Sequence, residues 1–229
     1  MRLIITRHGQ TDWNAEGRLQ GHQDIPLNST GISQAETLRD ELAGMHFDLI
    51  IASPLSRAYK TAEIINSKHN LEILRDNRIK EIYLGKLEGQ TKDSDLIDFG
   101  VLWTDEMLRP LDVELNRDFF ARVADFTDEI AETYDGKDVL IVCHSGVYRE
   151  FYQYFNGITE HYLDIPGLKN CEFRDFTLHT VDPQDIIENE LKTKDENIKS
   201  GDTIRIKNSK KRYKVESIDG DTIRIKPLK

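Results

Sequence analysis

Three short runs of apolar residues predict the strands of a buried sheet. They lie at residues 3–5 (LII), 48–52 (DLIIA) and 138–143 (DVLIVC), and apolar and polar positions do not alternate within them. Runs of this kind are typical of parallel strands that are covered by helices on both faces. Further strands are predicted at 71–84 and at 171–179, and the second of these would lie at an edge of the sheet.

Helical patterns lie between these strands. Apolar residues recur at helical spacing within residues 32–43, 55–68 and 115–134, and a fourth helix is predicted at 147–155. Strands that alternate with helices predict a three-layer α/β/α fold with a largely parallel sheet. Residues 90–114 are less regular and predict a helical insertion or lid.

The end of the chain has a different pattern. The heptapeptide GDTIRIK occurs at residues 201–207 and again at 220–226. Its alternation predicts strands with Ile pointing inward and Arg or Lys outward, and residues 212–218 alternate in the same way. The sequence therefore predicts a small β-meander over 199–229, after a main domain at residues 1–181. The acidic residues 182–198 predict a linker or an exposed helix.

Charge is distributed unevenly over the 229 residues. The net charge is −10, from 31 basic and 41 acidic residues. Residues 198–229 hold ten basic and four acidic residues (+6), which leaves 21 basic and 37 acidic residues (−16) for the rest. An evenly acidic protein would repel nucleic acid and anionic membranes. The basic tail keeps nucleic-acid binding open, but the favoured interpretation is that it pairs with the acidic domain. Its basic residues include Lys207, Lys210, Lys211, Arg212 and Lys214.

The remaining composition indicates a cytoplasmic protein. Cys143 and Cys171 provide no disulfide framework and indicate a reducing compartment. The first residues do not form a signal peptide, and no apolar run approaches the roughly 18–20 residues of a transmembrane helix. The seven histidines show no ligand-like spacing, so neither a metal nor another cofactor is expected.

Polar side chains follow three of the predicted strands at their carboxyl ends, where open α/β sheets bind ligands. In chain order they are Arg7, His8 and Gly9, then Ser53 and Arg57, then His144, Ser145 and Gly146. The two guanidinium groups suit phosphate. Gly9 would let the backbone approach a ligand, and an imidazole beside the arginines can attack phosphorus. The sequence therefore predicts a site for phosphoryl transfer.

The same segments resemble the motifs of the histidine phosphatase superfamily, which has the phosphoglycerate mutase-like fold. The resemblance covers about residues 1–180 and keeps the order of the family's motifs. The matching segments are LIITRHGQTDWN at 3–14, GRLQG at 17–21, DIPLN at 24–28, SPLSRA at 53–58, EI at 81–82 and HSG at 144–146.

The resemblance implies roles for the matched residues in hydrolysis of a small phosphate monoester. His8 would become phosphohistidine, and Glu81 would protonate the leaving alkoxide and then activate water, with Glu88 as its near competitor. Charge on the phosphoryl oxygens would be stabilised by the side chains of Arg7, Arg57 and His144. The pocket would be lined further by Asn14, Gln20, Gly21 and Ser145.

Two positions depart from the family pattern. Ser145 stands where many members have glycine, and it would either hydrogen-bond to phosphate or cap the next helix. Residues 113–115 read Val-Glu-Leu where phosphatase members often carry Gly-Glu-Ser, so this resemblance does not identify the substrate.

Other activities are weighed against the phosphatase. Cys143 and Arg149 form a Cys-x5-Arg pattern, which would make Cys143 a thiolate nucleophile. Phosphoglycerate mutases of the family carry a longer segment between the acid and the second histidine than the 63 positions from Glu81 to His144. A pseudoenzyme that only binds a phosphorylated ligand is disfavoured, because all five matched catalytic positions are present. A histidine phosphatase is therefore the favoured interpretation.

Overall fold

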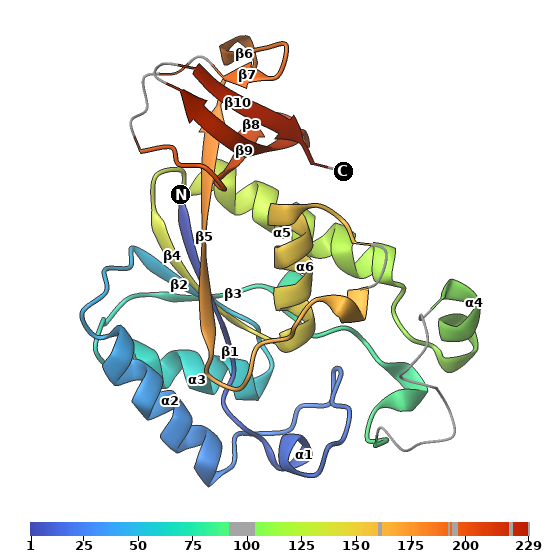
Figure 1. Ribbon diagram of the computed structural model, residues 1–229. Helices are drawn as coiled ribbons and strands as arrows, with labels where there is room; N and C mark the ends of the chain where they lie inside the picture. Colours follow the sequence, from blue (N-terminus) through green and yellow to red (C-terminus); the bar gives the residue numbers. More distant parts are fainter. Residues whose placement is uncertain (92–103, 160–161, 192, 194–196, 220–221, 229) are drawn as a thin grey trace.

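The computed structural model describes residues 1–91, 104–159, 162–191, 193, 197–219 and 222–228. Their strands form one sheet in the order β3-β2-β4-β1-β5-β8-β9-β10-β7-β6 (Figure 1). The strands are β1 (Arg2–Arg7), β2 (Leu49–Ala52), β3 (Ile73–Arg75), β4 (Asp138–Cys143), β5 (Phe173–Val181), β6 (Ile186–Ile187), β7 (Glu190–Leu191), β8 (Thr203–Ile206), β9 (Arg212–Asp219) and β10 (Thr222–Pro227).

Helices cover both faces of the first part of this sheet. Strand β1 pairs in parallel with β4, β4 with β2, and β2 with β3, whereas β5 is antiparallel to β1. Leu3 and Ile5 pack with α5 and α6, and Ile4 packs with α2 and α3 on the opposite face. The predicted three-layer α/β/α fold with a largely parallel sheet is confirmed. Its helices are α2 (Ser29–Leu42), α3 (Ser56–Asn66), α5 (Asn116–Thr133) and α6 (Ser145–Asn156), with the short α1 (Asp12–Ala15) and α4 (Asp105–Leu108) outside the layers.

Two of the predicted strands differ from the structure. The segment 71–84 holds only β3, followed by two short 3-10 turns. Strand β5 is not at an edge of the sheet, because its nine residues extend past β1 and its last four pair with β8. Within the predicted insertion at 90–114, residues 92–103 lie outside the described part, and α4 and a 3-10 turn follow them.

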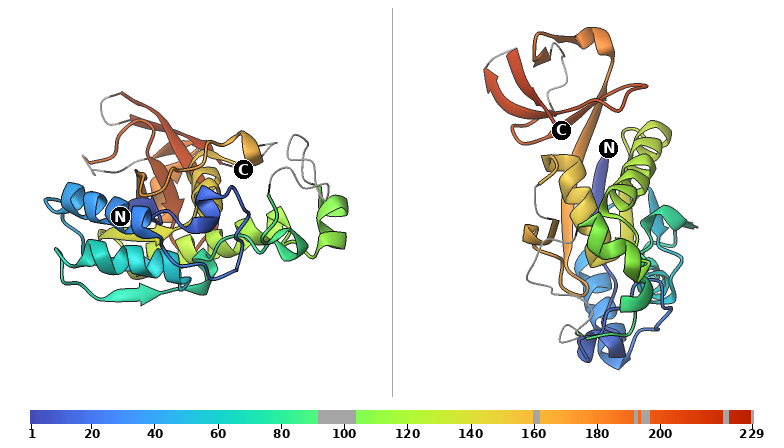
Figure 2. Two further views of the ribbon diagram at one scale, coloured as in Figure 1. Left: turned by 90° about the horizontal axis from the view of Figure 1, so that it is seen from below. Right: turned by 90° about the vertical axis from the view of Figure 1, so that its right-hand side faces the viewer.

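The predicted β-meander is present as β8, β9 and β10, which pair in antiparallel fashion. The prediction of a linker or exposed helix at 182–198 is wrong for residues 186–191, because β6 and β7 form a hairpin there and β7 pairs with β10. These strands have an apolar core of their own, in which Leu191 and Ile198 are buried. Figures 1 and 2 show the meander at the end of the molecule where β1 begins.

The arginines of the two heptapeptides lie in different surroundings. Arg224, in the second copy, is exposed as predicted. Arg205, in the first copy, is only 2% exposed, so the predicted outward direction is wrong there. Its guanidinium donates to Asp128 (2.9 Å) and Glu132 (2.7 Å) of α5. The two copies differ because α5 covers this face of β8.

Other basic residues of the tail also contact the acidic part of the chain. Arg212 donates to the carbonyl of Tyr154 (2.6 Å), and Lys214 donates to that of Phe155 (3.0 Å). Both carbonyls belong to the last turn of α6, where the helix dipole favours cations. Lys210 donates to Asp125 (2.7 Å). These contacts support the interpretation that the tail pairs with the acidic domain.

The buried Arg205 is expected to stabilise the attachment of the meander. Arg205→Met leaves Asp128 and Glu132 without their cation, so the free energy of unfolding is expected to fall by about 3–5 kcal/mol. Arg224→Met is the matched control, because it changes the same position of an identical heptapeptide at the surface and is expected to cost less than about 0.5 kcal/mol. Urea denaturation followed by circular dichroism measures both. Equal losses in the two variants would contradict this account.

Candidate functional site

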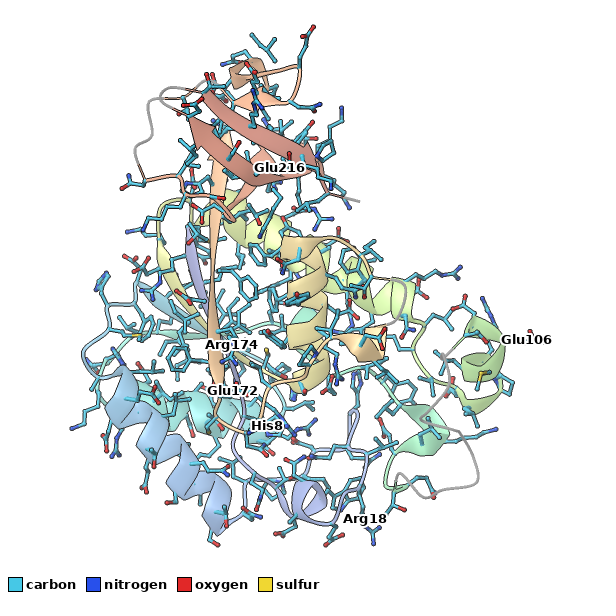
Figure 3. All side chains as sticks on the ribbon, viewed as in Figure 1. His8, Arg18, Glu106, Glu172, Arg174 and Glu216 are labelled. Atoms are coloured by element: carbon cyan, nitrogen blue, oxygen red, sulfur yellow. The ribbon has the colours of Figure 1, made fainter. Side chains whose placement is uncertain are left out.

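A pocket of about 550 Å³ lies at the carboxyl ends of β1 and β4, at the opposite end of the sheet from the meander. Figure 3 shows His8 at this end. Eight of the nine residues predicted for the site line the pocket, and His144 is the exception. The eight are Arg7, His8, Asn14, Gln20, Gly21, Arg57, Glu81 and Ser145.

His8 is held with one ring nitrogen available to the pocket. It follows β1, is only 3% exposed, and its Nδ1 lies 2.6 Å from the carbonyl of Gly9. A carbonyl only accepts hydrogen bonds, so Nδ1 carries the hydrogen and Nε2 of the neutral ring has the lone pair. Burial, and then the charges of Arg57 and Arg7, lower the pKa of His8 well below its usual value. The ring is therefore neutral at physiological pH.

His144 lies behind His8 and is fully buried. The two ring centroids are 5.2 Å apart, and Nε2 of His144 lies 2.8 Å from the hydroxyl of Ser53, at the end of β2. Burial and the neighbouring Arg57 lower the pKa of His144 as well. The motif segments at 53–58 and 144–146 therefore meet in space, as the order of strands predicts.

Two guanidinium groups lie near His8, and that of Arg57 is fully buried. Arg57 donates to the carbonyls of Gly21 (2.8 Å) and Gln23 (2.7 Å), and Arg7 donates to that of Leu168 (2.9 Å). Burial lowers the pKa of Arg57 to about 10, so it stays charged at neutral pH. Within the described residues, Nε of Arg7, Nε of Arg57 and Nδ1 of His144 are buried and have no hydrogen-bond partner. The guanidinium groups of Arg7 and Arg57, which line the pocket, suit an anion with several oxygens, such as phosphate.

Glu81 is oriented toward the pocket by backbone amides. Its two carboxylate oxygens accept hydrogen bonds from the amides of Ile82 (3.0 Å) and Gly146 (3.2 Å). Gly146 lies in the first turn of α6, so the HSG segment at 144–146 also positions the carboxylate of Glu81. Ser145 begins this helix, and His144 rather than Ser145 occupies the N-cap position. Of the two roles expected for Ser145, capping is therefore wrong, and its place in the pocket lining remains.

Arg122 holds the segment that carries Glu81. From α5 it donates to the carbonyls of Lys80 (2.8 Å) and Glu81 (2.9 Å) and to both carboxylate oxygens of Glu114 (2.6 and 2.9 Å). Glu114 in turn accepts from the amide of Tyr83 (3.1 Å). The Val-Glu-Leu departure at 113–115 therefore retains a glutamate that fixes the backbone around Glu81.

Glu88, the competitor of Glu81, has a different position. It accepts from the amide of His22 and from the side chain of Gln23, both at 2.7 Å, and it does not line the pocket. Gly21 has a φ of +52°, and a Cβ there would overlap the Glu88 carboxylate. Glu88 therefore holds the loop whose carbonyls bind Arg57.

Some residues of the site carried weaker sequence signals. Asn170 donates to the carbonyl of His8 (2.9 Å) and to the side chain of Asn14 (3.3 Å), and Thr61 accepts from the amide of Gly9 (3.0 Å). A Cβ on Gly9 would overlap the carbonyl of Gly31, so this glycine permits chain packing rather than the expected approach to a ligand. Nothing in the pattern around Asn170 marks it as a neighbour of His8, because the contact spans 162 positions.

The structure argues against a cysteine nucleophile. Cys143 is fully buried in β4 and packs in the apolar core. Burial raises the pKa of its thiol far above the usual range. A thiol in these surroundings is not ionised and does not reach the pocket.

No cluster of three or more His, Cys, Asp or Glu side chains in the described part of the chain is arranged to hold a metal ion. Its helices also include none with the length and apolarity that crossing a bilayer requires. Two histidines, two arginines and one carboxylate are brought together at the carboxyl ends of β1 and β4, an arrangement that suits a phosphoryl group on an α/β fold.

Comparison with known proteins identifies the family. The sequence profile of the histidine phosphatase superfamily (branch 1) matches residues 3–184, and the chain belongs to this superfamily. A 2-carboxy-D-arabinitol-1-phosphatase of wheat (Triticum aestivum) is 33% identical over 176 residues, which are 74% of this chain and 35% of the wheat protein. Phosphoserine phosphatase 1 of Hydrogenobacter thermophilus is 32% identical over 157 residues, which are 66% of this chain and 74% of that protein.

Solved structures agree with this assignment. The structure of a mycobacterial glucosyl-3-phosphoglycerate phosphatase is similar with a TM-score of 0.68 and 25% identity, over 77% of this chain and 90% of that chain. The resemblance of the sequence to the superfamily and to its fold is thus confirmed, and the protein is a phosphatase of this superfamily. The chain spans only about a third of the wheat relative.

Proposed function

We propose that the protein hydrolyses a small-molecule phosphate monoester, with His8 as the nucleophile and Glu81 as acid and then base. The observation that carries this proposal is the orientation of His8. Its Nδ1 is bound to the carbonyl of Gly9, so Nε2 is the nitrogen available in a pocket that Arg7, Arg57 and Glu81 also line.

In the first step, Nε2 of His8 attacks phosphorus and the bond from phosphorus to the leaving oxygen breaks. Glu81 gives its proton to that oxygen, so the leaving group departs as an alcohol. The positive charge on the phosphorylated ring is stabilised by the hydrogen bond from Nδ1 to the carbonyl of Gly9. Arg7 and Arg57 stabilise the negative charge on the phosphoryl oxygens.

In the second step, water attacks the phosphohistidine from the place that the alcohol has left. Glu81, now a carboxylate, takes a proton from this water. The bond between Nε2 and phosphorus breaks, inorganic phosphate is released, and His8 returns to its neutral form. Fixed amide donors on both carboxylate oxygens keep Glu81 in one place for both roles.

The proposal extends to the organisation and setting of the chain. Residues 1–181 form the catalytic domain, and the basic strands at 199–229 are a module that binds its acidic surface rather than nucleic acid. The contacts of Arg205 and Arg212 with the catalytic domain support this assignment. A cytoplasmic location remains a prediction from the sequence.

The test is release of inorganic phosphate from a panel of monoesters by the full-length protein. We expect turnover together with an acid-labile phosphoenzyme, and a rate that does not depend on a bisphosphoglycerate primer. Cys143→Ser is expected to keep the rate within about threefold, because the thiol is outside the pocket. A primer requirement would favour mutase-type transfer, and loss of turnover in Cys143→Ser with normal folding would favour the cysteine nucleophile.

A further inference from the structure

We propose that His22 is a positioning residue for the acid, because it holds the backbone of Glu81 from the loop that also binds Arg57. The inference rests on the proposed function and adds a residue to its machinery. Nε2 of His22 lies 2.8 Å from the carbonyl of Glu81. Among the described residues, His22 is not one that lines the pocket, so it acts through Glu81 rather than on the substrate.

Glu81 belongs to a segment that no regular element fixes. It follows the 3-10 turn at Asn77–Ile79, and residues 81–84 belong to neither a helix nor a strand. Its carboxylate accepts from the amide of Ile82 in the same segment, and from that of Gly146 at 3.2 Å, which is long for a hydrogen bond to a carboxylate. The position of the carboxylate therefore depends on what holds the backbone of residue 81.

Two side chains from separate elements hold this backbone. The carbonyl of Glu81 accepts from Nη2 of Arg122 (2.9 Å), on α5, and from Nε2 of His22, on the loop after α1. A carbonyl only accepts hydrogen bonds, so Nε2 of His22 carries the hydrogen. Burial lowers the pKa of His22, so the half-buried ring is neutral at physiological pH. The ring also packs against Tyr83, with the two centroids 5.3 Å apart.

The neighbours of His22 on the loop bind the phosphoryl side of the site. The carbonyls of Gly21 and Gln23 accept from the guanidinium of Arg57 at 2.8 and 2.7 Å. Three successive residues therefore hold both the guanidinium that binds the phosphoryl group and the backbone of the acid. An acid transfers its proton only within about 2.6–3.2 Å of the leaving oxygen, so the distance between these two groups is critical. Glu88 accepts from the amide of His22, and glutamine at position 88 would keep an accepting oxygen, so Glu88→Gln leaves the ring in place.

Two substitutions separate the hydrogen bond of His22 from its ring. His22→Phe keeps a ring against Tyr83 and removes the donor, whereas His22→Gln removes the ring and retains an N–H donor at a similar reach. A displaced Glu81 matters only where the leaving group needs a proton, so His22→Phe is expected to lower kcat/KM for an alkyl phosphate by about 10- to 100-fold. His22→Gln is expected to recover this activity to within about fivefold of wild type.

A substrate that needs no proton reports damage elsewhere in the site. Formation of the phosphoenzyme from p-nitrophenyl phosphate, followed by rapid mixing, is expected to stay within about threefold of wild type in His22→Phe. The ¹⁵N ring shifts of the wild-type protein give an independent readout. We expect His22 to carry its hydrogen on Nε2, the opposite tautomer to that of His8, and a ring with its hydrogen on Nδ1 would overturn the inference.

The remaining outcomes separate this inference from the proposed function. An equal loss with both esters in His22→Phe would show that the ring acts on the loop of Arg57, and unchanged alkyl activity would show that Arg122 alone holds the acid. An alkyl loss that is the same in His22→Phe and His22→Gln would assign the effect to packing of the ring. Each of these results overturns the inference and leaves the phosphatase activity standing. A wild-type protein that forms no phosphoenzyme with either ester overturns the proposed function itself.

Discussion

His8→Ala is expected to lower kcat/KM for phosphate monoesters by more than about 10³-fold and to abolish the phosphoenzyme. The alanine removes the atom that forms the bond to phosphorus, and no other histidine or cysteine lines the pocket in the described part of the chain. Rapid mixing with a ³²P-labelled ester, followed by alkaline quenching, measures the covalent intermediate and the rate together.

The matched control for this variant is a histidine far from the pocket. The side chain of His46 is 76% exposed at the surface, and His46→Ala is expected to leave both the intermediate and the rate within about twofold of wild type. A labelled protein with His8→Ala, or a label that survives acid, would assign the phosphoryl group to another residue.

The protonation of His8 gives a second readout. Its pKa is lowered, so the ring takes up a proton only at a lower pH than the ordinary value of about 6.5. As the pH falls from about 7.5 to about 5.5, the ¹⁵N ring shifts of His8 are therefore expected to remain those of a neutral imidazole protonated at Nδ1. A ring that titrates near pH 6.5 would show that burial and the charges of Arg57 and Arg7 do not act as described.

Much of the fold and the site is local in the sequence. The unbroken apolar runs of β1, β2 and β4 predict parallel strands, and the residues that follow them converge because parallel strands end at one edge. This is why the sequence alone predicts that Arg7, His8 and Arg57 lie in one crevice. Glu81 follows no central strand of this kind, and only the family resemblance indicated it.

What could not be predicted depends on contacts between distant segments. Nothing distinguishes Arg205 from Arg224 within two identical heptapeptides, since only the docking of β8 on α5 buries the first. In the same way, Arg122 holds the backbone of Glu81 across 41 positions. Strands β6 and β7 have two residues each, which is too short to produce an alternating pattern.

Glu81→Gln is expected to affect the two steps of the reaction differently, depending on whether the leaving group of the substrate needs a proton. Glutamine has no proton to give, so kcat/KM for an alkyl phosphate is expected to fall by about 10²- to 10⁴-fold. p-Nitrophenolate leaves readily without a proton, so formation of the phosphoenzyme from p-nitrophenyl phosphate is expected to be nearly unchanged. Hydrolysis of the phosphoenzyme still requires a base. Phosphohistidine on His8 is therefore expected to accumulate after a burst of p-nitrophenol.

Glu88→Gln is the control that makes this result specific. Glu88 is seven residues away, has the same side chain as Glu81, and holds the amide of His22 rather than facing the pocket. Its replacement loosens the loop that binds Arg57, so any loss is expected to be similar for alkyl and p-nitrophenyl esters and to show no burst. If Glu88→Gln gave the burst and Glu81→Gln did not, the acid and base would be Glu88. If both variants lost alkyl and p-nitrophenyl activity equally, neither carboxylate would transfer the proton to the leaving group.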